Sequence, residues 1–471
     1  MRSSRGAVII GVVLLCSFFF LRHVPAAGIS RELPTKIAAL FQDPRFEGFT
    51  VSAQVVALGS GSVLFEKNPK QPLIPASSVK LVTAATALKK LGPEFVFRTE
   101  ALKNGAEVWI RGGGDPSLVT ERLYLLASDI RASGIQKISR LCADESRAPP
   151  PLLQEARKPE ETDRAFNAPI GALNLNYNSV RVHFSPEKGK LRARVEPPGQ
   201  FVQVVTSGVK LVSGPKWQLV FTRKIGPKND QIVVSGSAPR DGSEKIRYFN
   251  VSRPGPYLLS TLGKMLEKEG IRVKSLSSCV GVTPQGAVPL ASVDSFPLRE
   301  IVVLMDKFSN NFISEALVNE LGHQAVGNAG SRAEGLSVLE TSMRNLGLWQ
   351  EQTRIVSPSG LDRATRMSAA SFVGLIRDLA TDSSVLPEFL SSLPLAGRDG
   401  TLKDRIFGFN PIGSLRAKTG TLDGVGSLVG IVQAVTGRLY VFAVILNYKD
   451  IERIDTRFWE SPLAQLLIDE G

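Results

Sequence analysis

Histidine is scarce in this chain, with three residues in 471. His23 lies in an apolar N-terminal segment, which leaves His183 and His323 for the rest of the protein. Two histidines give no basis for a histidine-rich metal site, and they offer few candidates for a Ser-His-Asp triad. We therefore expect no metal or cofactor, and a serine nucleophile here would need a base other than histidine.

Cysteine is equally scarce. Cys16 lies in the N-terminal segment, so Cys142 and Cys279 are the two that remain. Two cysteines do not make a disulfide scaffold. They could pair in an oxidising compartment or stay as two free thiols, and the sequence leaves both possibilities open.

Long runs of basic residues are also missing, although the formal net charge is +13. Without such a run, or aromatic residues interleaved with basic ones, the sequence does not indicate a nucleic-acid partner. The positive charge predicts only a mild preference for anionic surroundings.

The N-terminus carries an export pattern. Arg2 and Arg5 precede an apolar run at residues 7–21, and the small residues at 24–28 offer a cleavage site. This arrangement is typical of a secretory signal peptide, and the run is shorter than the roughly 20 residues of a spanning helix. We expect residues 1–27 to be a signal peptide and the protein to be exported, with an uncleaved N-terminal anchor as the alternative.

The chain is long enough for two or three folded units. Residues 49–57 and 62–66 predict a hairpin, and so do residues 427–435 and 439–446 near the other end. Because both ends supply strands, we expect one sheet built from both, with the middle of the chain as an insertion.

The middle of the chain mixes helical and strand patterns. Helices are predicted at 119–133, 254–270 and 331–346, whereas residues 180–246 contain short β-branched runs separated by Gly and Pro turns. This mixture predicts an α/β protein that carries a small all-β insert.

Ser77 and Lys80 open an Ala- and Leu-rich helical run that stops at Gly92. Residues three apart on a helix share one face, so the lysine amine can reach the serine hydroxyl. Ser-x-x-Lys is a weak pattern, and on its own Ser77 would be interpreted as an N-cap serine. The pattern occurs three more times, always in predicted turns and strands: Ser185/Lys188, Ser207/Lys210 and Ser213/Lys216.

Two further motifs support the interpretation of Ser77 as a nucleophile. Ser309-Asn310-Asn311 stands just before a helical stretch, and Lys418-Thr419-Gly420 lies on a predicted strand. Ser-x-x-Lys, Ser-x-Asn and Lys-Thr-Gly in this order are the motifs of penicillin-binding proteins and serine β-lactamases. Each motif is weak alone, but the three together, each in its expected context, are specific.

The side chains suggest a division of labour. Lys80 would take the proton of Ser77, and burial beside Lys418 would lower its pKa for that purpose. Ser309 could pass the proton to a leaving amine.

The remaining motif residues are suited to binding substrate. The Asn311 amide could bind the substrate backbone, while Lys418 and Thr419 could bind a terminal carboxylate. The backbone N–H groups of Ser77 and Thr421 form the natural oxyanion pair. Gly420 has no Cβ, so the strand edge could lie close to the substrate.

On these motifs the chain resembles the D-alanyl-D-alanine carboxypeptidase/endopeptidases of the class C penicillin-binding protein 4 (DacB) family, peptidase family S13. The resemblance covers nearly all of the chain beyond the N-terminal segment and includes four more stretches, at residues 112–118, 174–178, 359–361 and 393–402. It implies a serine β-lactamase/DD-peptidase-like antiparallel sheet flanked by helices, with two nested inserted domains. The implied ranges are 28–95 and 280–471 for the catalytic domain, 96–180 and 247–279 for the first insert, and 181–246 for the nested β-rich insert.

The resemblance also implies an activity and a location. Ser77 would attack D-alanyl bonds of peptidoglycan in the periplasm and be acylated by β-lactams, and the basic protein could touch an anionic envelope surface. Asp144 and Arg363 match the positions that hold the side chain of the stem peptide in relatives. The aromatic residue expected after Asp144 is missing, because the sequence there is Asp-Glu-Ser-Arg-Ala. A β-lactamase-like hydrolase and a non-catalytic envelope-binding protein are the alternatives.

Overall fold

The computed structural model describes residues 32–148, 165–275, 279–327, 332–406, 413–448 and 455–471. The predicted signal peptide, residues 1–27, lies outside these ranges. Within them, no helix is both long and apolar enough to cross a membrane.

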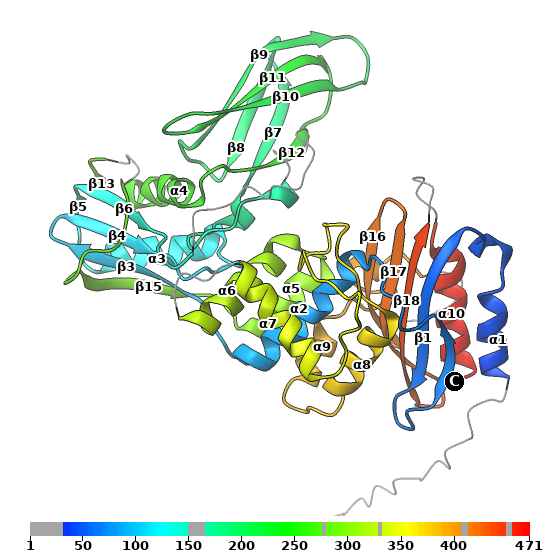
Figure 1. Cartoon of the computed structure of the whole chain (residues 1–471). Helices are drawn as coiled ribbons and strands as arrows, with labels where there is room; N and C mark the ends of the chain where they lie inside the picture. Colours follow the sequence, from blue (N-terminus) through cyan, green and yellow to red (C-terminus); the bar gives the residue numbers. More distant parts are fainter. Residues whose placement is uncertain (1–31, 149–164, 276–278, 328–331, 407–412, 449–454) are drawn as a thin grey trace, which may run out of the picture.

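One end of the molecule is built on a five-stranded antiparallel sheet (Figure 1). Its strand order is β16 (Leu415–Leu422), β17 (Val425–Gln433), β18 (Leu439–Tyr448), β1 (Phe49–Ala57) and β2 (Val63–Lys67). β1 and β18 pair along their whole length, from Phe49 opposite Tyr448 to Ala57 opposite Tyr440. The prediction that the two ends of the chain share one sheet is confirmed.

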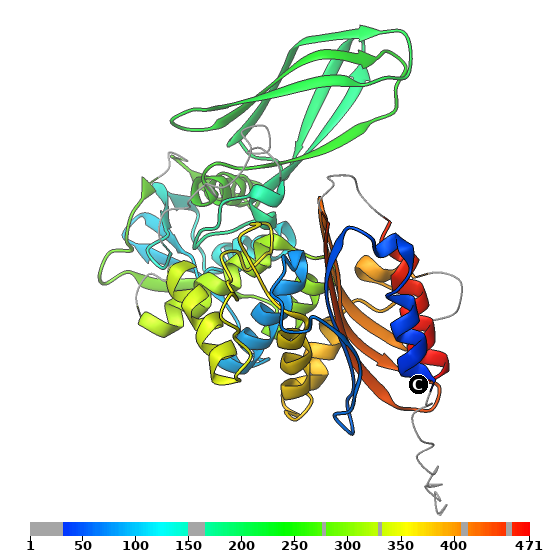
Figure 2. The ribbon, with the colours of Figure 1, turned by 45° about the vertical axis from the view of Figure 1, so that its right-hand side comes forward.

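Both faces of this sheet are buried, which explains why β18 is apolar almost throughout. Tyr440, Phe442 and Val444 belong to a hydrophobic cluster with the two terminal helices, α1 (Leu33–Leu40) and α10 (Arg457–Asp469). Those two helices lie side by side on one face of the sheet (Figure 2). Val441 and Ala443 point the other way, as the period of two requires, and join the second cluster.

The second cluster fills the space between the sheet and a layer of helices. This layer contains the helix that follows Ser77 and the helix that begins at Asn311, so it positions two of the three motifs. Its helices are α2 (Lys80–Leu91), α5 (Leu298–Lys307), α6 (Asn311–Val326), α7 (Arg332–Asn345), α8 (Ala369–Leu379) and α9 (Leu386–Ser392).

The chain between β2 and α5 includes a second sheet with two helices. Its strand order is β14 (Cys279–Val280), β6 (Arg140–Asp144), β4 (Glu107–Arg111), β3 (Arg98–Asn104) and β15 (Val288–Asp294). The helices are α3 (Thr120–Ala132) and α4 (Pro254–Lys268), and a short parallel pair joins β5 (Lys137–Ile138) to β13 (Arg272–Val273).

The β-rich insert stands apart at the top of Figure 1. It consists of two three-stranded sheets, one with β7 (Ser179–Glu187), β8 (Lys190–Glu196) and β12 (Lys245–Asn250), the other with β9 (Val202–Val212), β10 (Gln218–Ile225) and β11 (Asp230–Pro239). Phe221 on β10 packs against Phe184 and Phe249 of the first sheet, with ring centroids 5.7 and 5.2 Å apart. These aromatic contacts hold the two small sheets together.

Strand pairing divides the chain slightly differently from the ranges expected from the sequence. β15 falls within residues 280–471, expected for the catalytic domain, yet it pairs with β3, with Asp294 opposite Arg98. β15 is an edge strand whose single fully buried side chain is Val293. Its weak apolar pattern therefore carries little information about the sheet to which it belongs.

Cys142 and Cys279 stand opposite each other in the neighbouring parallel strands β6 and β14. Both are free thiols in the structure, with Cys142 buried and Cys279 partly exposed. The sequence left open whether these two cysteines form a disulfide, and in the structure they do not.

Substitution of Phe372 tests the packing of the helix layer against the sheet. Its side chain is fully buried in the second cluster, so we expect Phe372→Ala to lower the free energy of unfolding by about 3–5 kcal/mol. Urea unfolding followed by circular dichroism measures this loss. Val220→Ala is the matched control, because Val220 is 62% exposed and its truncation should change stability by less than about 0.5 kcal/mol. Equal losses for the two variants would contradict this account of the core.

Candidate active site

Ser77 lies in a single 3₁₀ turn, η2 (Ala76–Val79), and Lys80 is the first residue of α2. The sequence predicted an α-helical start, whereas the turn is the tighter 3₁₀ form. Residues three apart eclipse each other in a 3₁₀ turn, so the relation between the two side chains is preserved. Lys80 Nζ lies 3.0 Å from Ser77 Oγ.

Lys80 has two further partners, both oxygen atoms. Its Nζ donates to Asn311 Oδ1 at 2.8 Å and to the backbone carbonyl of Ser359 at 2.6 Å. An amine that has lost one proton keeps two N–H donors and gains one lone pair. Neutral Lys80 can therefore keep both oxygen contacts and accept the proton of Ser77.

The surroundings favour that neutral form. Lys80 is fully buried, and burial is the main cause that holds its pKa well below the ordinary 10.5. The positive charge of Lys418 lowers the pKa further, while Asp306 and Glu315 act in the opposite direction. Burial beside a second cation is a recognised way to turn a lysine into a base.

Lys418 reaches the same space from the middle of β16. It is fully buried, and its Nζ donates to Ser309 Oγ at 3.0 Å and to the carbonyl of Thr419 at 2.8 Å. Burial lowers the pKa of Lys418 to about 8, with Asp306 opposing this shift and Arg405 adding to it. Lys80 and Lys418 thus bring two amines into one buried site, each hydrogen-bonded to a serine hydroxyl.

The Ser309–Asn311 motif forms a strained turn into α6. Ser309 has a positive φ of 53°, a conformation that a residue with a Cβ adopts at a cost of about 1–3 kcal/mol. Asn310 caps the helix, because its Oδ1 accepts a hydrogen bond from the Ile313 N–H at 3.1 Å. The strain at Ser309 and the cap at Asn310 direct the side chains of Ser309 and Asn311 toward the two lysines.

β16 is one of the two edge strands of the sheet, so alternate backbone groups face away from β17. The Ala417 N–H donates outward to the Pro394 carbonyl at 3.1 Å, and the Leu415 carbonyl accepts from the Ala396 N–H at 3.0 Å. Because strand backbones repeat every two residues, Thr419 and Thr421 present their groups on this same outer side. The Thr421 N–H thus faces the side on which an oxyanion donor is needed.

Gly420 has a different role from the one expected. A Cβ on Gly420 would lie 2.3 Å from Ser427 Oγ and 2.5 Å from the Pro75 carbonyl oxygen. The side of the strand where a Cβ would stand is therefore filled by the turn that precedes Ser77, and not by open space for a substrate. The glycine allows β16 to lie against the nucleophile turn.

Three groups of the site escaped the sequence analysis: Asp306, Glu315 and the Ser359 carbonyl. Asp306 is fully buried, its Oδ2 accepts from Ser392 Oγ at 2.8 Å, and burial raises its pKa to about 7. Glu315 accepts from Ser359 Oγ at 2.8 Å and from Arg332 Nε at 2.9 Å. The one available signal was an acid on the apolar stripe of α5, since Asp306 stands four residues after buried Val302.

Asp144 and Arg363 have different hydrogen-bond partners in the structure. Asp144 is buried, and its carboxylate accepts hydrogen bonds from Ser146 and Thr283. Burial alone would raise the pKa of Asp144, but these hydrogen bonds bring it below its ordinary value. Arg363 is exposed and donates to the Asp423 carbonyl at 2.7 Å. The Asp144 carboxylate thus joins β6 to the loop at Thr283.

The assembled groups can perform acyl transfer on a serine. They include a nucleophile with an adjacent amine base, a second hydroxyl held by a cation, and backbone N–H donors at a strand edge. In the described ranges, no group of three or more His, Cys, Asp or Glu side chains is placed to hold a metal ion.

Comparison with known proteins agrees with this chemistry. The chain matches the D-Ala-D-Ala carboxypeptidase 3 (S13) family over residues 33–469. It is 31% identical over 440 residues to the D-alanyl-D-alanine carboxypeptidase of Actinomadura sp. (strain R39), which covers 88% of this chain and 81% of that protein.

Solved structures show the same fold. Penicillin-binding protein 4 (dacB) from Haemophilus influenzae superposes with a TM-score of 0.78 at 21% identity, covering 92% of this chain and 99% of that one. The same protein complexed with a novel β-lactam gives a TM-score of 0.74 at 22% identity, with the same coverage. The resemblance drawn from the three motifs is confirmed, and the chain belongs to the D-Ala-D-Ala carboxypeptidase 3 (S13) family.

Proposed function

We propose that this protein is a serine-type D-Ala-D-Ala carboxypeptidase that cleaves peptidoglycan stem peptides through an acyl-enzyme on Ser77. The observation that carries the proposal is the contact between Ser77 Oγ and the buried amine of Lys80, 3.0 Å away. A fully buried lysine beside a second buried lysine is costly to maintain. Its depressed pKa is what base catalysis at neutral pH requires.

Acylation begins with a proton transfer from Ser77 to Lys80. Ser77 Oγ then attacks the carbonyl carbon of the penultimate D-alanine, and the carbonyl oxygen becomes negatively charged. The N–H groups of Ser77 and Thr421 would stabilise that charge, because donors fixed in advance need no reorganisation as the charge develops. Asn311 keeps Lys80 in place through its Oδ1, which leaves its Nδ2 to bind a substrate carbonyl.

Collapse of the tetrahedral intermediate requires a proton on the leaving nitrogen. Ser309, held at 3.0 Å by Lys418, can donate its hydroxyl proton to that nitrogen and recover the proton that Lys80 took from Ser77, which returns Lys80 to its neutral form. The C–N bond breaks and D-alanine leaves. Water then attacks the Ser77 ester with Lys80 again as the base, which restores the serine hydroxyl and releases the shortened peptide.

The same groups explain the preference for a terminal carboxylate. Lys418 supplies a positive charge near Thr419, whose Oγ1 is fixed by Thr401 Oγ1 at 2.8 Å. A carboxylate of D-alanine fits this pair, and so does the carboxylate of a penicillin, which would acylate Ser77 in the same way. Cleavage of a D-alanyl cross-link would use the same steps with a larger leaving amine, so endopeptidase activity is part of the proposal.

The place of action is also part of the proposal. The charge and hydrophobicity pattern of residues 1–27 supports export, and peptidoglycan peptides are encountered in the periplasm. The net charge of +13 supports peripheral contact with an anionic envelope surface.

Replacing the nucleophile tests the proposed chemistry. We expect Ser77→Ala to abolish covalent labelling by a fluorescent penicillin and to lower hydrolysis of a D-Ala-D-Ala peptide by about 10⁴-fold or more. Ser207→Ala is the matched control, because Ser207 and Lys210 repeat the same spacing on strand β9, where residues three apart face opposite sides. Labelling of the Ser77 variant would contradict the proposal, and rapid turnover of the bound penicillin by the wild type would indicate a β-lactamase.

The acidic limb of the pH profile reports the ionisation of Lys80. Lys418→Met removes a nearby positive charge that lowers the pKa of Lys80, so the pKa rises and the limb of penicillin acylation should move to higher pH. Asp306→Asn removes a negative charge that raises the pKa of both lysines, so the limb should move to lower pH. Stopped-flow acylation between pH 5 and 10 measures both shifts. Shifts in the same direction would be inconsistent with Lys80 as the base.

A further inference from the structure

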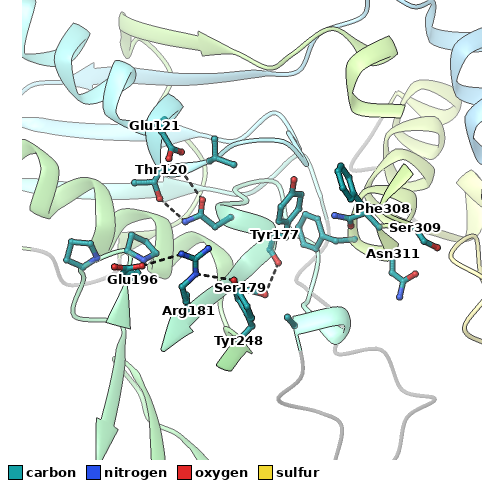
Figure 3. Close-up of a pocket in the computed structure, with 17 residues that line it drawn as sticks. Thr120, Glu121, Tyr177, Ser179, Arg181, Glu196, Tyr248, Phe308, Ser309 and Asn311 are labelled. Carbon is teal, nitrogen blue, oxygen red and sulfur yellow. Dashed lines mark hydrogen bonds and ion pairs between the residues drawn. The ribbon is translucent and has the colours of Figure 1, made fainter. Parts of the chain in front are cut away.

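A cavity of about 770 Å³ reaches from the Ser309–Asn311 turn to the β-rich insert (Figure 3). Its walls come from the start of α3, from η5 (Asn176–Asn178) and from strands β7, β8 and β12. Pockets that bind organic ligands have volumes of about 300–1,000 Å³. The cavity is thus large enough for a ligand portion that lies beyond the reacting bond.

Several aromatic rings line this cavity. Phe308, the residue before Ser309, is 68% exposed, and Tyr248 on β12 is 49% exposed. Tyr177 also lines the cavity and is held edge-to-face by Phe312, with ring centroids 6.0 Å apart. Rings left this open to water are typical of surfaces that a ligand covers.

The charged groups of the cavity are largely compensated within the protein. Arg181 donates to the Tyr248 hydroxyl at 3.1 Å and lies 3.8 Å from the Glu196 carboxylate. Glu196 also lies 3.0 Å from His183. An ionic ligand would have to compete with these pairs, whereas a neutral ligand with many hydroxyl and amide groups would not.

Polar groups for such a neutral ligand are already positioned. Asn176 Nδ2 donates to Thr120 Oγ1 at 2.8 Å, and the Thr120 N–H donates back to Asn176 Oδ1 at 3.0 Å. This reciprocal pair fixes the Thr120 hydroxyl and the Asn176 amide at one wall. Glu121 beside them is exposed and lines the same cavity. Apolar ring faces combined with a fixed hydroxyl, a fixed amide and a nearby carboxylate match the alternating faces and edges of a sugar.

We propose that this cavity binds the glycan portion of the substrate, the N-acetylated amino sugars to which the stem peptide is attached. The inference rests on the proposed function, because it assigns one site to the sugar end of the molecule whose peptide end reacts at Ser77. A four-residue stem peptide extends roughly 13 Å, which separates the sugar from the scissile bond. The sugar ring packs against Tyr248 and Phe308, and the β-rich insert supplies the distal wall.

The test compares two substrates that differ only in the sugar, namely a pentapeptide ending in D-Ala-D-Ala and the same pentapeptide on a disaccharide of N-acetylglucosamine and N-acetylmuramic acid. The wild type should have the higher kcat/KM for the disaccharide form. Tyr248→Ala should reduce this preference by about 3- to 10-fold, the effect of losing one aromatic contact. Its kcat/KM for the free pentapeptide and its penicillin acylation should stay unchanged, and Tyr248→Phe should retain most of the preference.

Ile246→Ala is the matched control, since Ile246 lies on the same strand with 47% exposure but does not line the cavity. It should leave the preference as it is. A wild type that does not distinguish the two substrates would overturn the inference, and so would equal losses of Tyr248→Ala on both substrates.

A binding measurement separates this inference from the proposed function. Calorimetric titration of Ser77→Ala with both pentapeptides reports sugar-dependent affinity without any hydrolysis. If the wild type neither labels with penicillin nor hydrolyses either substrate, the proposed function fails, while tighter binding of the disaccharide form, weakened by Tyr248→Ala, supports the glycan site. Equal affinity for the two forms overturns the glycan site whatever the activity.

Discussion

The site depends on two lysine amines that are removed from water in one small volume. Lys80 and Lys418 are both fully buried, and each would lose a large hydration free energy if it remained charged without partners. The protein resolves this conflict by lowering the pKa of both and by giving each amine oxygen acceptors. The carboxylates of Asp306 and Glu315 oppose the lowering of the Lys80 pKa, and Asp306 also opposes that of Lys418. The chemistry follows from this balance, because a lysine that loses its proton easily is a base.

The fold brings together, at these amines, three segments that are far apart in the sequence. The nucleophile turn contributes Ser77 and Lys80, the turn before α6 contributes Ser309 and Asn311, and the edge strand β16 contributes Lys418. The sheet built from both chain ends fixes the third segment against the first, since Gly420 lies directly on the turn before Ser77. The inserted domains supply none of these five side chains. Their residues form the far wall of the cavity beside Ser309.

Much of this arrangement could be predicted from the sequence, because local patterns carried it. The strands at both ends showed their period or their continuous apolar character, and the motifs named five side chains that the structure brings together. Contacts made by backbone groups left no such trace: the Ser359 carbonyl binds Lys80 from a loop 279 positions away along the chain. Asp144 shows a second limit of prediction from the sequence. A matching motif position does not reveal that the carboxylate turns inward to bind Thr283, a contact between segments that only the fold creates.

The central claim is that burial, together with the charge of Lys418, lowers the pKa of Lys80 so that its amine can act as a base. Carbon-13 labelling of lysine side chains at Cε, with the Lys80 resonance assigned by its loss in Lys80→Arg, allows this ionisation to be followed directly by nuclear magnetic resonance. The account predicts that the Lys80 resonance titrates well below 10.5, apart from the exposed lysines. A Lys80 resonance that titrates together with the exposed lysines would contradict it.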